Sequence, residues 1–288
     1  MVNDLRELVA QELGQAVDPR VGDIAAAIAA QHGEASRAVL FYGSCLREER
    51  LDGLMLDFYL IVSDYGAAYP KCWLAIANRL IPPNVFYFEK DGLAAKYAVL
   101  SEADFHRLNG PATSSVSVWA RFAQPARLAW DSSDEARQRA IDAVARAAPT
   151  LLVAAGVRKG EAPLDWWRRA FALTYSAELR AERKGKGQSV VDMDRARYER
   201  FGGPAVAAIP SALPKQASWP RRRIEGKALS VARLAKASLT FAGGADYIAW
   251  KINRHAGADI QLKPWQRRHP LLAGITLLPR LLRSGAVR

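Results

Sequence analysis

The amino-acid sequence predicts an α+β protein with a small β-sheet near its N-terminus and a helical remainder. Three observations support this class. Runs of β-branched and aromatic residues that are typical of strands are confined to the first hundred or so positions. Helical patterns follow from residue 102 onward. Half of the 288 residues are apolar and 24% are charged, which is the composition of a folded chain rather than a disordered one.

The sheet is predicted from four short runs. They lie at residues 37–42, 54–62, 84–89 and 96–101. The first ends at the pair Gly43-Ser44, and a turn at Asp91-Gly92 separates the last two. Helices are expected around these strands, at residues 5–32 with a break at Asp18-Pro19 and at residues 70–80. We therefore expect a small mixed sheet flanked by helices.

The rest of the chain is predicted to be helical and to divide into two parts. Further helices are expected at residues 102–108, 134–154 and 164–183. A proline-rich stretch at residues 202–220 is expected to be a linker. The predicted organisation is a sheet-containing domain at residues 1–130, a helical domain at residues 131–205 and a basic helical C-terminal region at residues 206–288.

Positive charge is concentrated in that last region. The chain has 41 Lys and Arg against 29 Asp and Glu, a formal net charge of +12. Residues 215–288 contain fifteen of the basic and three of the acidic side chains, so they carry the entire surplus. Such an asymmetry predicts a polyanionic partner, either nucleic acid or an anionic membrane surface.

The apolar pattern of the basic region favours a membrane, with nucleic acid as the weaker alternative. Residues 229–241 predict a helix whose Arg233 and Lys236 lie off its apolar face. Basic groups beside Trp and Leu, here with the apolar run at residues 271–282, are typical of interfacial lipid contacts. The alternative is that these helices pack on the main domain and present their charges to solvent.

No membrane-spanning helix is expected, because the longest apolar run, residues 271–279, is shorter than the roughly 18 residues required. The first residues lack the apolar stretch of a signal peptide. The two cysteines, Cys45 and Cys72, form neither a disulfide framework nor a metal-ligand pattern. We therefore expect a cytoplasmic protein that is peripherally associated with the inner face of a membrane.

Asp57 is the most informative residue of the sequence, because a carboxylate within a buried strand needs a cation or hydrogen-bond partners. Gly43 and Ser44 end the preceding strand, and a Gly-Ser turn allows close approach of a phosphate to the backbone. Together they predict a site for a triphosphate and Mg²⁺, with the acid on the metal. The alternative is an ordinary turn followed by a core strand with one turn aspartate.

This arrangement resembles the nucleotidyltransferase superfamily, whose motif is an apolar strand, Gly-Ser, and then Asp-x-Asp/Glu on the next strand. The first acid of that motif would fall at position 55, where this chain has Met55. Residues two apart on a strand share a face, so one ligand is missing there. Asp52 could replace it from the loop, or one carboxylate and the substrate phosphates could suffice. A third possibility is an inactive relative that only binds nucleotide.

Several segments sharpen the resemblance within residues 38–200. Phe41-Tyr-Gly-Ser-Cys45, Leu54-Met-Leu-Asp-Phe58 and Lys96-Tyr-Ala-Val-Leu-Ser101 occur in the order and spacing that resemble the mitochondrial-type phosphatidate cytidylyltransferase family, that of the translocator assembly and maintenance protein. Residues 119–130 resemble that family's post-sheet helix and short basic strand-like segment. The resemblance implies that CTP and phosphatidate, or a related lipid phosphate, react with Mg²⁺ at a membrane surface to give CDP-diacylglycerol and pyrophosphate.

Residue roles follow from the resemblance. Gly43 and Ser44 would grip the triphosphate, and Asp57, with Asp52 as a second candidate, would bind Mg²⁺. Lys96 would neutralise a phosphate, although a surface lysine at a strand edge is the alternative. The expected lipid and membrane contacts are Arg221, Arg222, Arg223, Arg267 and Arg268. The competing hypotheses are a nucleotidyltransferase for nucleic acid or a small molecule, and a non-catalytic lipid- or nucleotide-binding relative.

Overall fold

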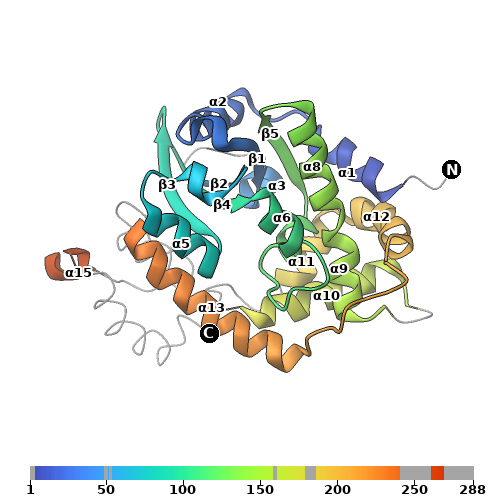
Figure 1. The fold of residues 1–288 in the computed structure, drawn as a ribbon. Coiled ribbons are helices and arrows are strands. Elements are labelled where there is room, and N and C mark those ends of the chain that lie inside the picture. Colours follow the sequence, from blue (N-terminus) through green and yellow to red (C-terminus); the bar gives the residue numbers. More distant parts are fainter. Residues whose placement is uncertain are drawn as a thin grey trace.

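A computed structural model describes residues 4–48, 51, 54–157, 161–178, 186–240 and 261–268. Its described part is an α+β structure with a five-stranded mixed sheet in the N-terminal half and a mostly helical C-terminal part (Figure 1). The strands are β1 (Ser36–Tyr42), β2 (Met55–Val62), β3 (Asn84–Lys90), β4 (Leu93–Ser101) and β5 (Ala126–Asp131). The sheet order is β3-β4-β2-β1-β5, with β2 and β4 parallel and all other neighbours antiparallel.

All four strands predicted from the sequence are present, and Asp91 and Gly92 form the tight turn between β3 and β4, both with positive φ. The fifth strand lies at the sheet edge beside β1 and is only partly buried, which explains why no apolar run marks it. It follows the one-turn helix α7 (Trp119–Phe122), so residues 119–131 contain a short helix and then a strand.

The helices around the sheet begin where the sequence provides capping groups. Asp4 and Asp18 accept backbone N–H bonds at the starts of α1 (Leu5–Leu13) and α2 (Pro19–Ala30), which confirms the predicted break. A 3-10 turn, η1 (Gly33–Ala35), leads into β1. The remaining helices among the strands are α3 (Ser44–Glu48), α4 (Tyr65–Ala68) and α5 (Cys72–Leu80).

The C-terminal part departs from the sequence prediction at three places. The helix expected at residues 134–154 is two helices that meet at Arg146, and residues 202–207 belong to α12 rather than to a linker. The last long helix begins ten residues earlier than expected, at Trp219. The helices here are α6 (Glu102–Leu108), α8 (Asp134–Ala145), α9 (Ala147–Ala155), α10 (Pro163–Ala177), α11 (Lys186–Met193), α12 (Arg195–Ala207), α13 (Trp219–Thr240) and α15 (Pro264–Arg268).

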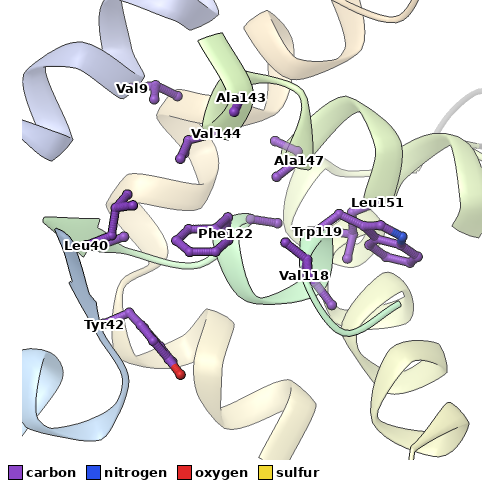
Figure 2. Packing of buried hydrophobic residues seen from close by; sticks show 14 of the residues in the cluster. Val9, Leu40, Tyr42, Val118, Trp119, Phe122, Ala143, Val144, Ala147 and Leu151 are labelled. Atoms are coloured by element: carbon purple, nitrogen blue, oxygen red, sulfur yellow. The ribbon is translucent and has the colours of Figure 1, made fainter. Parts of the chain in front are cut away.

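The two faces of the sheet are covered by different elements. One face packs on α2 and on residues of α4 and α5. The other packs on α1, α6 and α7 and is continuous with the core of the helical part. Figure 2 shows Phe122 of α7 between the strand residues Leu40 and Tyr42 and the helix residues Val144 and Ala147. A single apolar cluster therefore joins the sheet to the helices that follow it.

A buried ion pair makes a second connection between the sheet-containing part and the helices. Arg197 of α12 donates from Nη2 to Oε1 of Glu12 in α1 at 2.9 Å, and its Nη1 donates to the Ala123 carbonyl oxygen at 3.1 Å. Both side chains are almost completely buried. The division of the chain at residues 130 and 205 stays a prediction.

Helix α13, orange in Figure 1, contacts α10 near one end and β3 near the other. Its first turn is fixed by Trp219, whose indole N–H donates to the Ala154 carbonyl oxygen at 2.9 Å. Among the described residues, no helix is both long and apolar enough to cross a membrane. The apolar run at residues 271–282 lies outside the described residues.

Candidate functional site

One cross-strand row contains the predicted acid and the predicted lysine. Asp57 of β2 pairs with Tyr42 of β1 on one side and with Lys96 of β4 on the other, and Lys96 in turn pairs with Tyr87 of β3. Residues directly opposite on neighbouring strands project to the same face. The four side chains therefore belong to the face that is continuous with the core of the helical part.

Gly43 follows this row immediately and lies against Asp57. Its φ of +98° is a conformation that residues with a side chain rarely adopt. A Cβ atom at this position would lie 2.7 Å from Oδ2 of Asp57, so both the backbone and the space require glycine. Ser44 is half-buried and begins α3. The structure thus brings Gly43 and Asp57 together, as the sequence prediction requires.

Lys96 forms an ion pair with Asp57, with Nζ 2.8 Å from Oδ1. The side chains of Lys96 and Asp57 are only 22% and 18% exposed, and β4 lies between β3 and β2, so the alternative of a surface lysine at a strand edge is wrong. Oδ1 is buried and has no hydrogen-bond partner of suitable geometry among the described residues. The lysine therefore balances the charge of Asp57 without satisfying its hydrogen-bonding capacity.

Arg121 of α7 adds a second cation next to this row. Its Cζ lies 4.8 Å from the centre of the Tyr42 ring, and its charge acts to lower the pKa of the buried Tyr59. Burial acts to lower its pKa, but Tyr42 and Tyr59, followed by the carboxylates of Asp57 and Glu178, outweigh that effect and raise it. Its Nε is buried without a hydrogen-bond partner in the described structure.

Helix α13 contributes two more cations from its inner face. Arg233 donates from Nε to the Pro82 carbonyl oxygen at 2.8 Å and from Nη1 to Oγ of Ser117 at 3.0 Å. Lys236 donates from Nζ to the Ile81 carbonyl oxygen. Burial lowers the pKa of Arg233, and burial followed by the charge of Arg233 lowers the pKa of Lys236 to about 7.

We refer to Lys96, Arg121, Arg233 and Lys236 as the cationic cluster. Among the described residues, the carboxylates that act on its members are Asp57 and Glu178. Burying four cations against two acids is unfavourable unless a further anion shares the site. The cluster is therefore suited to bind a polyanion such as a nucleotide triphosphate or a phosphate ester.

Arg121, Arg233 and Lys236 were not among the predicted site residues. The two on α13 were expected to lie off an apolar face, with a solvent-exposed position as the alternative. The structure reverses that orientation, because the apolar side chains Val231 and Leu234 are exposed and the two cations point inward. Their spacing of three residues on one helix was the available signal, but their partners lie more than a hundred residues away in the sequence.

The predicted magnesium site is supported by one carboxylate only. Met55 occupies the position of the missing acid and is half-buried, and Asp52 lies outside the described residues. No group of three or more His, Cys, Asp or Glu side chains that could bind a metal occurs in the described part of the chain. Oδ1 of Asp57, which faces the Lys96 ammonium, fits a metal cation in its place, provided that phosphate oxygens complete the coordination.

The predicted lipid contacts divide into three groups. Arg222 is only 1% exposed, and its guanidinium donates to the carbonyl oxygens of Thr113, Ser114 and Ala217, so it is not available to a membrane and that prediction is wrong. Arg221 and Arg223 are exposed. Arg267 and Arg268 end α15, and their side chains lie outside the described structure.

A half-open hollow of about 290 Å³ lies elsewhere, among α1, α9 and residues 208–213. It is lined by residues such as Leu5, Arg146 and Val153 and includes none of the predicted site residues. Because an acid, a glycine with positive φ and partly buried cations converge at Asp57, we regard its surroundings as the functional site.

Comparison with known proteins does not assign the chain to a family. No protein-family model matches the chain, and no curated protein is similar enough to it to count as a relative. The function is therefore inferred from the site itself and from the sequence motifs.

Proposed function

We propose that this protein is a Mg²⁺-dependent nucleotidyltransferase that transfers CMP from CTP to phosphatidate, or to a related lipid phosphate, at a membrane surface. The observation that supports it most is the contact between Gly43 and Asp57 at the edge of the cationic cluster. This places one acid, one glycine turn and several cations around the same face of the sheet. The choice of CTP and of a lipid acceptor comes from the family resemblance.

In this proposal the reaction needs charge neutralisation more than proton transfer. A phosphate monoester is already ionised near neutral pH, so one of its oxygens can attack the α-phosphorus of CTP without a general base. The bond from that phosphorus to the bridging oxygen breaks, and pyrophosphate leaves with the electron pair. Lys96 and Arg121 would neutralise the triphosphate, and Arg233 and Lys236 would orient the phosphate nearest to α13.

Asp57 would bind Mg²⁺ together with phosphate oxygens of the nucleotide, because its buried Oδ1 already faces a cation, the Lys96 ammonium, at 2.8 Å. When bound, the metal supplies further neutralisation of the triphosphate and of the leaving pyrophosphate. Lys96 has to release Asp57 for this, and the nucleotide phosphates offer it a replacement anion. Gly43 keeps the approach to Asp57 open, since any side chain there would occupy the space beside Oδ2.

The deciding experiment measures pyrophosphate release from each of the four nucleoside triphosphates with Mg²⁺ and phosphatidate. We expect release with CTP, and we expect Asp57→Asn to lower turnover by about 100-fold or more while the protein stays folded. Glu89→Gln is the matched control, because Glu89 is an exposed acid on β3 whose carboxylate accepts from Tyr87. Unchanged turnover in Asp57→Asn would exclude the metal-binding role.

A nucleotide-binding protein without transferase activity is the second candidate, and Met55 in place of an acid favours it. This candidate predicts that CTP binds at the cationic cluster but that no pyrophosphate is released with any acceptor. Binding measured by calorimetry, next to the turnover assay, separates the two. Arg121→Gln is expected to weaken CTP binding under both candidates.

A further inference from the structure

The outer face of α5 carries a stripe of large apolar side chains. Trp73, Ile76 and Leu80 are 45%, 54% and 74% exposed. Their spacing of three and four residues places them on one side of the helix. The opposite side of α5 is buried through Ala75 and Asn78. We refer to Trp73, Ile76 and Leu80 as the α5 stripe.

Helix α13 has a similar outward face. Ile224 is 72% exposed, and Val231 and Leu234 are also exposed. These positions lie on the side of the helix opposite Arg222, Arg233 and Lys236, which bind the rest of the protein. The helix is therefore amphipathic, but its cations face the protein and its apolar groups face outward, which is the opposite of the usual surface helix.

The two helices adjoin each other where α5 ends. Lys236 and Arg233 of α13 donate to the carbonyl oxygens of Ile81 and Pro82, which directly follow α5. Figure 1 shows α5 beside the C-terminal half of α13. Exposed apolar groups on two adjoining helices are more than the isolated apolar residues that any protein surface carries.

Basic side chains edge both helices. Lys71 and Arg79 on α5 and Lys227 on α13 are exposed, and residues 71–80 contain no acid. The one acid of α13, Glu225, is paired with Arg221 at 2.5 Å. An anionic partner is thus favoured.

We propose that the α5 stripe and the outer face of α13 insert together into the headgroup region of a bilayer that contains anionic lipid. This inference rests on the proposed function and names the surface through which the enzyme would reach its lipid. Trp with Leu and Ile, edged by Lys and Arg, is the composition of interfacial contacts. A bilayer fits better than an acidic protein because the inner face of α13 carries cations suited to a lipid phosphate.

The first test uses the two cysteines. Cys72 is exposed at the start of α5 and Cys45 is buried, so a polarity-sensitive fluorophore can be attached to Cys72 alone. We expect its emission to shift to the blue with phosphatidylcholine vesicles that contain phosphatidic acid, and less with pure phosphatidylcholine. Co-sedimentation with the anionic vesicles without any spectral shift would overturn the proposal.

The second test removes the stripe. The double variant Trp73→Ser/Ile76→Ser is expected to bind the anionic vesicles about tenfold more weakly, because two apolar side chains no longer leave water. Met193→Ser, at a 57% exposed position on α11, is the matched control and should bind within about twofold of the wild type. Unchanged vesicle binding by the double variant would contradict the inserted surface.

Other occupants of the surface give distinct results that also overturn the proposal. If another part of the chain covers the stripe, the double variant loses thermal stability. If a second copy covers it, the variant changes the oligomeric state in sedimentation. Turnover of a soluble short-chain phosphatidate separates the two proposals: the double variant should retain it, whereas its absence in the wild type would refute the proposed function and leave the vesicle result standing.

Discussion

The two faces of β2 differ in the side chains that they bury. Leu56, Phe58, Leu60 and Val62 point to one face and are completely buried against apolar side chains. On the other face Tyr59 and Ile61 are buried in the same way, but the row ends in Asp57 and the half-buried Met55. The strand is thus a core element on one side and a core element with a charged end on the other.

The difference indicates that the end of the sheet next to Asp57 is less favourable for folding stability than the fully apolar face. The first face shows that this sheet can be sealed with apolar groups from nearby helices. At the charged end of the second face, β4 and α7 instead place the cations Lys96 and Arg121 near Asp57, and each cation has to be desolvated. In the described part of the chain, Oδ1 of Asp57 faces the Lys96 ammonium without a hydrogen bond of suitable geometry, and Nε of Arg121 is buried without a hydrogen-bond partner. A buried site that is costly and incompletely satisfied is typical of ligand binding.

The largest effect is expected on the sealed face. Phe58→Ala removes a fully buried ring and should lower the free energy of unfolding by about 3–5 kcal/mol. Met55→Ala on the other face should cost clearly less, because Met55 is half-exposed. Urea titrations of both variants check this, and equal losses would show that the two faces do not differ.

Replacing a cation of the charged end should raise stability while weakening binding. The pKa of Lys236 falls from 10.5 to about 7 on folding. Below pH 7 the folded protein carries the full cost of a buried charge; between pH 7 and 10.5 the unfolded chain binds more protons, so that cost is relieved as pH rises. Lys236→Met should therefore stabilise by roughly 1–4 kcal/mol at pH 6 and by less at pH 9.

Urea titrations at both pH values measure this difference, and a larger gain at pH 9 would contradict it. The same group makes a binding prediction. Because a triphosphate favours the charged form of Lys236, CTP affinity of the wild type should fall as pH rises above 7. Lys236→Met should show weaker binding and a flatter pH dependence.

A smaller effect on stability is expected at the glycine that faces Asp57. Gly43→Ala should cost about 1–3 kcal/mol, because its φ is strained for alanine and its Cβ would meet Oδ2 of Asp57. Gly92→Ala is the matched control, with a φ of +75° and no atom within 4 Å of the added Cβ. Both variants should lose stability, but only Gly43→Ala should lose CTP binding in calorimetry.

Local patterns predicted the part of the site that lies on neighbouring strands. Gly43 and Asp57 are adjacent because their strands are consecutive and antiparallel, which a short-range argument captures. The ion pair between Lys96 and Asp57 depends on β4 pairing in parallel with β2, and strand order was not predicted. This is why Lys96 could be mistaken for an edge lysine.

The rest of the site depends on long-range contacts that no local pattern encodes. Arg121 comes from a four-residue helix, and Arg233 and Lys236 reach the Pro82 region across about 150 positions. Arg222 illustrates the reverse error: it stands in a run of three arginines that reads as a solvated surface, yet it is the buried one. The concentration of basic residues in the sequence predicted an anion-binding region, but it did not predict the direction in which each side chain points.

The pairing of Glu12 with Arg197 has a consequence for how the protein can be shortened. Glu12 of α1 supplies the negative charge that balances the buried guanidinium of Arg197 in α12. Trimming the N-terminus past α1 would strand that guanidinium inside apolar surroundings. The opening residues are therefore a structural component of a region that lies 185 positions downstream.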